Sequence, residues 1–233
     1  MRKRTVVDSN ALYVVSIWIL PVLIAVTFHE AAHGYVARFL GDDTASRLGR
    51  LSLNPLGHID LFGTIVLPGF LLLARSPFLF GYAKPVPVNF RALRNPRSGM
   101  VLVAAAGPAM NIGLAIIAAL SFHLVGYLPV IIARWTALNL KNAVIINVLL
   151  AIFNLFPLPP LDGGRIAVGL LPKALATQFA RLERYGMLIL LGIFILLPLL
   201  GPQLGVDLGF VSHFISSATN GVIRAILKLT GNT

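Results

Sequence analysis

Cysteine is absent from this chain of 233 residues, and charged residues are scarce. Only 12% of the residues are charged, and only 8 of them are Asp or Glu, whereas 57% of the chain is hydrophobic. Without cysteine there can be no disulfide and no thiolate ligand, so a bound metal would have to be held by histidine and carboxylate. A soluble domain usually carries about twice this charged fraction. The composition therefore excludes an ordinary soluble domain and indicates a chain that folds in a lipid bilayer.

Long apolar segments account for the hydrophobic content, and several approach or exceed the roughly 20 residues that a membrane-spanning helix needs. They are residues 11–40, 61–80, 99–127, 137–156 and 185–200. A further segment, residues 208–229, has apolar residues at helical spacing together with Arg224 and Lys228. That pattern fits either an interfacial amphipathic helix or a last crossing. We therefore predict an all-α polytopic membrane protein with about four to six transmembrane helices.

The formal net charge is +11, but the basic residues do not form a continuous stripe. They lie in short clusters between the apolar segments, such as Arg91, Arg94 and Arg97, or Arg181 and Arg184. Such clusters are typical of membrane-protein loops that stay on the cytoplasmic side and face anionic lipid. No nucleic-acid-binding motif accompanies them. We predict the lipid bilayer, and no nucleic acid, as a partner.

The first apolar segment contains the motif His29-Glu30-Ala31-Ala32-His33. Histidines at positions i and i+4 lie one above the other on a helix face, so both imidazoles can bind one Zn²⁺. Glu30 is offset around the helix and is placed to accept a proton from metal-activated water instead. This is the H-E-x-x-H arrangement of metal-dependent peptidases. A polar pair that only helps helices to pack would not need this combination of side chains.

A catalytic zinc usually has three protein ligands and an open position, so a third ligand is needed. Asp162 is the favoured carboxylate because it follows a long apolar segment within NLFPLPPLDGG, where prolines end the helix and glycines allow close backbone approach. Unwound backbone at membrane depth is tolerated only where protein buries it or where it lines a wet cavity. The other aspartates lie in polar stretches and are expected to be solvated or capping: Asp8, Asp42, Asp43, Asp60 and Asp207.

Two asparagines are further candidates for the site. The amide of Asn154 can donate a hydrogen bond to a developing oxyanion, although an interhelical hydrogen bond is the alternative. Asn111 lies beside a row of small residues that lets helices approach closely. It fits a packing role at least as well as a role beside the metal ligands.

Several motifs together resemble the site-2 protease family of intramembrane zinc metalloproteases. In chain order they are HEAAH, GPAMN and NLFPLPPLDGG, and the loops GRLSLNP and KPVPVN also look like those of the family's compact members. The resemblance implies that His29, His33 and Asp162 hold zinc and that Glu30 is the general base. It also implies that Asn154 lies near the substrate carbonyl. Gly107, Pro108 and Asn111 match the family's G-P-x-x-N element.

The resemblance covers most of the chain, roughly residues 11–165, and implies a fold and an activity. Residues 1–233 are expected to form one transmembrane metalloprotease domain, with a catalytic core at about 11–165, C-terminal helices at about 166–229, and no recognisable PDZ or CBS domain. The expected cofactor is one Zn²⁺. The expected activity is hydrolysis of peptide bonds in or near the transmembrane segments of single-pass membrane proteins, as in regulated intramembrane proteolysis. The compact form suggests a multi-pass protein of a prokaryotic plasma membrane.

The metal ligands also constrain the topology. One zinc ion about 2 Å from each ligand requires His33 and Asp162 to lie towards the same side of the membrane. If residues 99–127 and 137–156 cross antiparallel, residues 61–80 cannot be a single crossing. We therefore expect a re-entrant or irregular membrane-associated segment near 48–90.

A substrate must present an extended peptide, because a helix hides its carbonyl groups. Part of residues 48–54 or 86–90 is hypothesised to offer a strand edge for it. Pro85 and Pro87 would suit an edge strand.

Two other functions are considered from the sequence: a catalytically silent zinc-binding scaffold that holds partners, and a metal or ion transporter. The scaffold would not need Glu30. An ion transporter would be expected to have more intramembrane carboxylates along a path.

Overall fold

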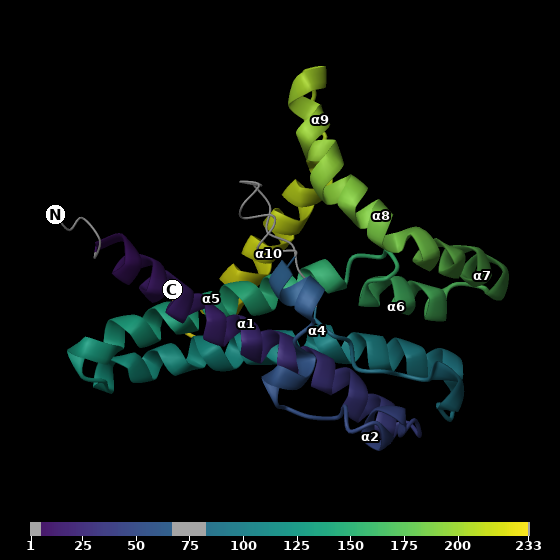
Figure 1. Cartoon of the computed structure of the whole chain (residues 1–233), viewed down its shortest axis with the longest axis horizontal. Helices are drawn as coiled ribbons and strands as arrows, with labels where there is room; N and C mark the ends of the chain where they lie inside the picture. The colour runs from purple at the N-terminus through teal and green to yellow at the C-terminus, as the bar shows by residue number, and fades with distance from the viewer. Residues whose placement is uncertain (1–5, 67–82, 233) are drawn as a thin grey trace.

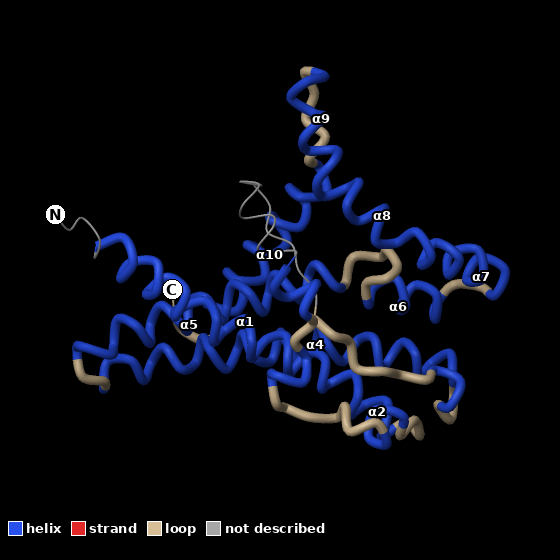
Figure 2. The backbone as a smooth tube through the Cα atoms, viewed as in Figure 1, coloured by secondary structure: helices blue, strands red, loops and turns tan. Residues whose placement is uncertain are grey.

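A computed structural model describes residues 6–66 and 83–232. These residues form helices and loops with no strand (Figure 2). Four helical stretches within them are long and apolar enough to cross a membrane, namely Leu12–Phe39, Pro96–Tyr127, Val130–Asn154 and Lys173–Gly201. The prediction of an all-α polytopic membrane protein is thus confirmed. Residues 67–82, which belong to the re-entrant or irregular segment predicted near 48–90, lie outside the described residues.

Three long helices form the centre of the molecule: α1 (Val6–Phe39), α4 (Pro96–Ser121) and α5 (Val130–Asn154). Each of them contacts the other two, and Figure 1 shows α1 lying across the pair formed by α4 and α5. Pro21 and Pro108 lie inside α1 and α4, respectively. Neighbouring helices satisfy the backbone groups that prolines leave unpaired in membrane helices, so both helices continue past their prolines.

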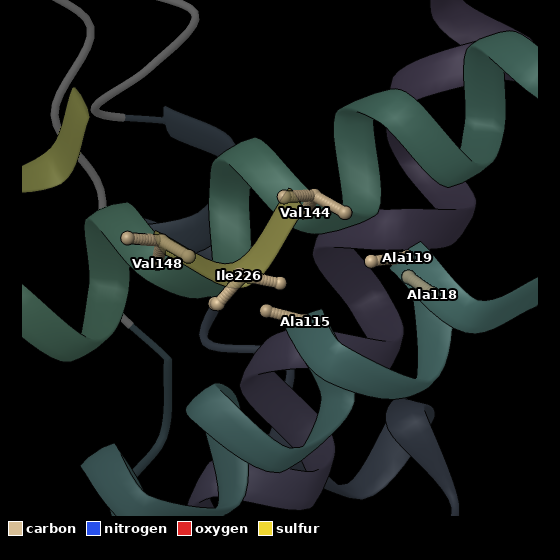
Figure 3. Packing of buried hydrophobic residues seen from close by; sticks show 6 residues of the cluster. All are labelled: Ala115, Ala118, Ala119, Val144, Val148 and Ile226. Carbon is tan, nitrogen blue, oxygen red and sulfur yellow. The ribbon is translucent and has the colours of Figure 1, made fainter. Parts of the chain in front are cut away.

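Small residues let these helices pack closely. A buried cluster joins α4, α5 and α10 (Phe210–Leu229), as Figure 3 shows. Its members are Ala115, Ala118, Ala119, Val144, Val148 and Ile226. Alanines on α4 bring the backbones near enough for van der Waals packing, which drives helix association where lipid removes the hydrophobic drive. Many large side chains on the outer faces are exposed instead, such as Ile131 and Ile117, as expected of surfaces that face lipid.

Helix α10 is the segment that the sequence left open between an interfacial helix and a last crossing. Its buried residues, Val211, Ile215, Thr219 and Ile226, recur at helical spacing, and α10 contacts α5 and α4. It is not among the four stretches of the described chain that are apolar enough to cross a membrane.

The remaining elements are short and connect or flank the long helices. Before α4 come α2 (Thr44–Arg47), η1 (Pro55–His58), η2 (Leu61–Val66) and η3 (Phe90–Ala92), and η4 (Phe122–Tyr127) follows it. After α5 come α6 (Asp162–Leu170), α7 (Lys173–Arg181), η5 (Leu182–Tyr185), α8 (Gly186–Leu191), η6 (Gly192–Leu196) and α9 (Leu197–Leu204). Helix α8 and η6 lie beside α5 and α10, where Phe194 packs on Phe153, and α9 extends away from the three central helices (Figure 1).

The break between α5 and α6 places Asp162 beside α1 and α4. Residues 155–161 form a turn, and α6 begins at Asp162 and packs against α4. A Cβ on Gly163 would lie 2.2 Å from the carbonyl oxygen of Leu155, so only glycine allows the turn to fold back onto the start of α6.

The loop at residues 83–95 is held against the end of α1. The Asp42 carboxylate, only 1% exposed, accepts hydrogen bonds from Thr44 N and Asn89 N at 3.0 and 2.6 Å. Leu93 and Val103 pack on Ala37 in a small apolar cluster beneath the loop. Asp42 was expected to be solvated or capping, and the structure shows a buried cap that joins two segments.

The expected strand edge at 48–54 or 86–90 does not form a strand in the structure. The reason is visible in the backbone donors. The N–H of Val86 donates to the Glu30 carboxylate and that of Asn89 to Asp42. Pro85 and Pro87 have no N–H, so few donors of this segment remain for a ladder.

Asp42 is expected to give a pH-dependent contribution to stability. Burial raises the pKa of this carboxyl group, but the hydrogen bonds from Thr44 and Asn89 outweigh it, so the pKa lies below its ordinary value. Because the folded pKa is lowered, the contribution is complete above the unfolded value of about 3.9 and is lost as the pH falls through the folded pKa. Asp42→Asn should cost about 1.5–3 kcal/mol near neutral pH and flatten the acid limb of a thermal-unfolding profile.

Asp43→Asn is the matched control for Asp42→Asn. The Asp43 carboxylate is half exposed and pairs with Arg47 one turn later, 2.8 Å away. An exposed pair of this kind contributes about 0.3–0.5 kcal/mol. Equal losses in the two variants would show that the Asp42 tether does not carry this stability.

Candidate metal centre

Two histidines on one face of α1 approach each other through their Nε2 atoms. His29 and His33 are both buried, their Nε2 atoms are 3.1 Å apart, and their rings meet edge to face. The spacing of four residues in a helix accounts for this arrangement. It is the geometry expected from the HEAAH motif.

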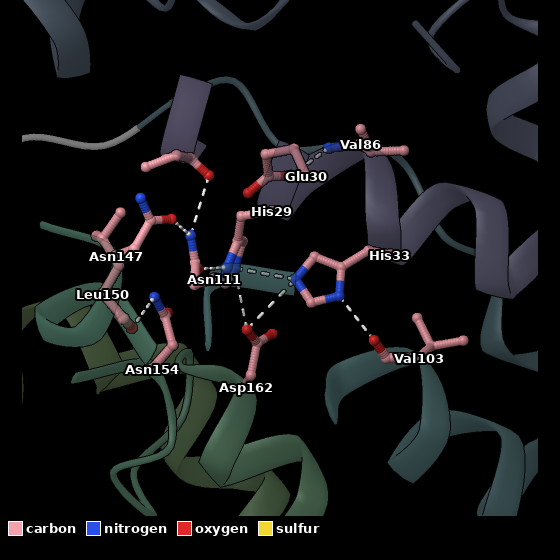
Figure 4. Close-up of polar contacts among 11 residues, drawn as sticks. His29, Glu30, His33, Val86, Val103, Asn111, Asn147, Leu150, Asn154 and Asp162 are labelled. Atoms are coloured by element: carbon pink, nitrogen blue, oxygen red, sulfur yellow. Dashed lines mark hydrogen bonds and ion pairs between the residues drawn. The ribbon is translucent and has the colours of Figure 1, made fainter. Parts of the chain in front are cut away.

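Asp162 completes the cluster from the first turn of α6 (Figure 4). Its Oδ2 lies 3.2 Å from His29 Nε2 and 3.3 Å from His33 Nε2. Across residues 6–66 and 83–232 this is the one group of three or more His, Asp or Glu side chains close enough to share a metal ion. The structure therefore brings together the three residues predicted as ligands.

The hydrogen bonds on the far side of each imidazole determine which nitrogen faces Asp162 with a lone pair. His29 Nδ1 lies 2.6 Å from Asn111 Oδ1, and His33 Nδ1 lies 2.7 Å from the carbonyl oxygen of Val103. Both partners are acceptors, so each Nδ1 carries the proton and donates it. Each Nε2 therefore presents a lone pair to the other ring and to Asp162, as a metal ligand must.

Three electron-rich atoms face one another in this buried space, and a zinc ion fits between them. Asp162 Oδ2 is buried and accepts no hydrogen bond, since the nitrogens facing it carry no proton. A tetrahedral zinc with ligands at about 2.0–2.1 Å separates its ligand atoms by about 3.3–3.4 Å. The observed separations of 3.1, 3.2 and 3.3 Å are close to that edge length. The residues present therefore suit the metal in number, type and spacing.

Gly107 on α4 makes room for the two imidazoles. A Cβ at this position would lie 2.5 Å from His33 Nε2 and 2.6 Å from His29 Nε2. The sequence identified Gly107 through the G-P-x-x-N element and as part of a row of small residues that lets helices approach closely. The structure shows that what approaches α4 at this point is the pair of imidazole rings.

Asn111, for which packing and a role beside the ligands were both open, is fully buried and contacts His29 directly. Its Nδ2 donates to the Ala25 carbonyl oxygen at 3.1 Å and to Asn147 Oδ1 at 2.8 Å. Sequence reasoning missed Asn147 and the carbonyl of Val103. Asn147 is the only polar residue in the stretch 143–153 of α5, two helical turns before Asn154, and this is the signal that could have drawn attention to it.

Glu30 is half-buried beside His29 and is not part of the three-residue cluster. Its Oε2 accepts a hydrogen bond from Val86 N at 2.9 Å, which fixes the carboxylate against the loop at 83–89. Figure 4 shows Glu30 and Asp162 on opposite sides of the histidine pair.

Asn154 lies in the last turn of α5 and is half-buried. Its Nδ2 donates to the carbonyl oxygen of Leu150 at 3.0 Å, within its own helix rather than across helices. An amide nitrogen has two N–H groups, so one donor is still available to another acceptor. The role of Asn154 as an oxyanion donor stays a prediction.

An H-E-x-x-H helix in a membrane segment, joined by a distant carboxylate, defines the class of membrane-embedded metallopeptidases. Residues 129–199 match the model of Peptidase family M50. YwhC of Bacillus subtilis (strain 168) is 41% identical over 182 residues, which cover 76% of this chain and 79% of that protein. Rip2 of Mycobacterium tuberculosis (strain H37Rv) is 26% identical over 207 residues, or 87% of this chain and 77% of that protein. The names of both relatives designate them as candidate zinc metalloproteases.

No solved structure matches the chain. The identity to YwhC over most of both chains, together with the family match, decides the assignment: the chain belongs to peptidase family M50, the site-2 proteases. It is thus a metalloprotease by family and, with four helical stretches able to cross a bilayer, a membrane protein.

Proposed function

We propose that this protein is an intramembrane zinc metalloprotease that hydrolyses peptide bonds in or near the transmembrane segments of single-pass membrane proteins. The observation that carries the proposal is the buried cluster of His29, His33 and Asp162, which fits zinc and is built partly on the membrane stretch Leu12–Phe39. A buried cluster of ionisable groups at membrane depth is costly and indicates function.

His29 Nε2, His33 Nε2 and an Asp162 carboxylate oxygen would hold one Zn²⁺. When bound, the ion supplies Lewis acidity, which polarises the scissile carbonyl and lowers the pKa of water. Asn111 and the Val103 carbonyl keep both imidazoles oriented by accepting hydrogen bonds from their Nδ1–H groups. Such partners fix the ring orientation and raise the basicity of the ligating nitrogens.

Glu30 moves the proton in this mechanism. Its carboxylate removes a proton from the attacking water and then delivers it to the leaving amine. The hydrogen bond from Val86 N occupies Oε2, so Oε1 is the oxygen that would take part. Anchoring one oxygen keeps the carboxylate oriented.

Asn154 supplies an oxyanion donor in this proposal. Its second N–H is not used by Leu150, and it lies on the Asp162 side of the site in Figure 4. Donors of this kind contribute roughly 3–4 kcal/mol to the stability of the transition state.

The substrate is proposed to be an extended peptide from a single-pass membrane protein, lying along residues 48–54, which pair with no strand in the described chain. Residues 86–90 are less suited to this role, because Glu30 and Asp42 already accept two of their backbone N–H groups. The bacterial relatives support a prokaryotic plasma membrane as the location.

Zinc content and chelator-sensitive cleavage test the proposed function. The purified protein in proteoliposomes is expected to contain one zinc per chain and to cut a member of a panel of single-pass reporters. A chelator should abolish the cut, and added zinc should restore it. His33→Ala should lose both the zinc and the cut. Zinc content unaffected by His33→Ala would show that the ion is held elsewhere.

A further inference from the structure

A second asparagine lies behind the metal centre, and no motif in the sequence assigns it a role. Asn147 lies in the middle of α5 and is only 2% exposed. It has no contact with His29, His33 or Asp162 among its hydrogen bonds. It connects to the centre only through Asn111 on α4.

Three hydrogen bonds connect His29 to the backbone of α5, and in each the donor lies on the side nearer His29. Asn147 Nδ2 donates to the Ala143 carbonyl oxygen at 2.9 Å, so Asn147 Oδ1 is the atom that faces Asn111. That oxygen accepts from Asn111 Nδ2 at 2.8 Å, which leaves Asn111 Oδ1 to face His29 Nδ1 at 2.6 Å. The series begins at a backbone carbonyl, which can only accept, so its direction is fixed from one end.

Reversing the Asn111 amide would break this arrangement. Its oxygen would then face two acceptors, Asn147 Oδ1 and the Ala25 carbonyl oxygen, and its NH₂ group would face His29 Nδ1. His29 Nδ1 would have to accept, and the proton would move to Nε2, where it blocks metal binding. Two acceptors oppose this reversal in the native protein, and without Asn147 only the Ala25 carbonyl would do so.

We propose that Asn147 is a positioning residue that sets the tautomer of His29 through Asn111, and so keeps Nε2 free to bind zinc. The proposal rests on the zinc site of the proposed function. It differs from simple helix packing in one respect: it specifies where the proton on His29 lies before any metal binds.

Asn147→Leu and Asn142→Leu form the test pair. Asn142 is also buried on α5, and its Nδ2 donates to the Ile17 carbonyl oxygen of α1 at 2.8 Å, with no connection to His29. Both substitutions replace a buried amide of α5 by an apolar group of similar size, facing α4 at Asn147 and α1 at Asn142. A general loss of packing would therefore affect both variants alike.

Two measurements on each variant decide the matter. The first is the zinc Kd, from competition with a chelator. It should rise about tenfold in Asn147→Leu, at the lower end of the 10–100-fold range for direct partners of ligating histidines. It should stay near wild type in Asn142→Leu. In metal-free protein with ¹⁵N-labelled histidine, the His29 signals should show Nδ1–H alone in wild type and in Asn142→Leu. Asn147→Leu should show a mixture of both tautomers. The chain has 5 histidines, and a His29→Gln sample assigns the signal.

Asn147→Asp keeps the experiment decisive if Asn147→Leu does not fold. The aspartate retains an oxygen that accepts from Asn111 Nδ2, so the Nδ1–H tautomer of His29 should persist. A mixture in Asn147→Asp, an unchanged tautomer and Kd in Asn147→Leu, or equal effects in Asn142→Leu would each overturn the proposal. The tautomer is read without metal or substrate, so a failure to find cleavage leaves this test unaffected.

Discussion

Glu30→Gln is expected to retain zinc and to cleave a membrane reporter roughly 100- to 10,000-fold more slowly than wild type, the range for loss of a general base. Zinc should be retained because Glu30 lies outside the cluster of His29, His33 and Asp162. The glutamine oxygen can still accept the hydrogen bond from Val86 N, so the loop at 83–89 should keep its place. Zinc content and kcat, measured on the same preparation, separate binding of the metal from the chemistry.

Glu183→Gln is the matched control, since it is the same substitution at a glutamate outside the cluster of His29, His33 and Asp162. Glu183 lies in η5, is half exposed and pairs with Arg165 at 3.6 Å. Its variant should cleave at the wild-type rate. If Glu30→Gln also kept the wild-type rate, the assignment of the base would be wrong. If Glu30→Gln lost its zinc, Glu30 would instead be a ligand.

The core of the site could be predicted from the sequence because its geometry is local. His29 and His33 are four residues apart on one helix, so their convergence follows from helical periodicity alone. Asp162 could be inferred because prolines and glycines mark a break in the helix where a carboxylate can reach inward. The structure brings all three side chains together.

Of the two partners of the imidazoles, Asn111 was a candidate from its motif, but its contact with His29 and that of Val103 with His33 depend on how α4 packs against α1. The Val103 carbonyl of α4, which accepts from His33, carries no side-chain signal in the sequence. Asn147 became relevant only when Asn111 was seen between it and His29.

In the loop before α4 the sequence predicted an edge strand that the structure does not form. The alternating prolines and valines of this loop suggested such a strand, which forms only if backbone N–H groups find a neighbouring strand. Here Asp42 and Glu30 accept those N–H groups through side chains instead. Residue patterns record the tendency to be extended, and the choice of hydrogen-bond partner is made by tertiary structure.

Gly107→Ala is expected to weaken zinc binding more than removal of a ligand's hydrogen-bond partner does. Such a removal lowers metal affinity about 10–100-fold. The added Cβ would lie 2.5–2.6 Å from the Nε2 atoms of His29 and His33, in the space that the metal and its ligands need. Helix propensity acts in the other direction, because alanine in a helix interior is favoured over glycine by about 1 kcal/mol. A loss of zinc would therefore report the contact with the imidazoles and not a weakened α4.

Gly113→Ala on the same helix separates these two effects. A Cβ at Gly113 meets no atom within 4 Å, so only the propensity term remains. This variant should bind zinc as wild type does and unfold at the same temperature or a slightly higher one. Zinc titration of the two variants measures the effect of the added Cβ on metal binding, and thermal unfolding measures the effect of helix propensity on stability. Wild-type zinc affinity in Gly107→Ala would mean that α4 can move away from the histidines, and that its close approach is not what shapes the metal centre.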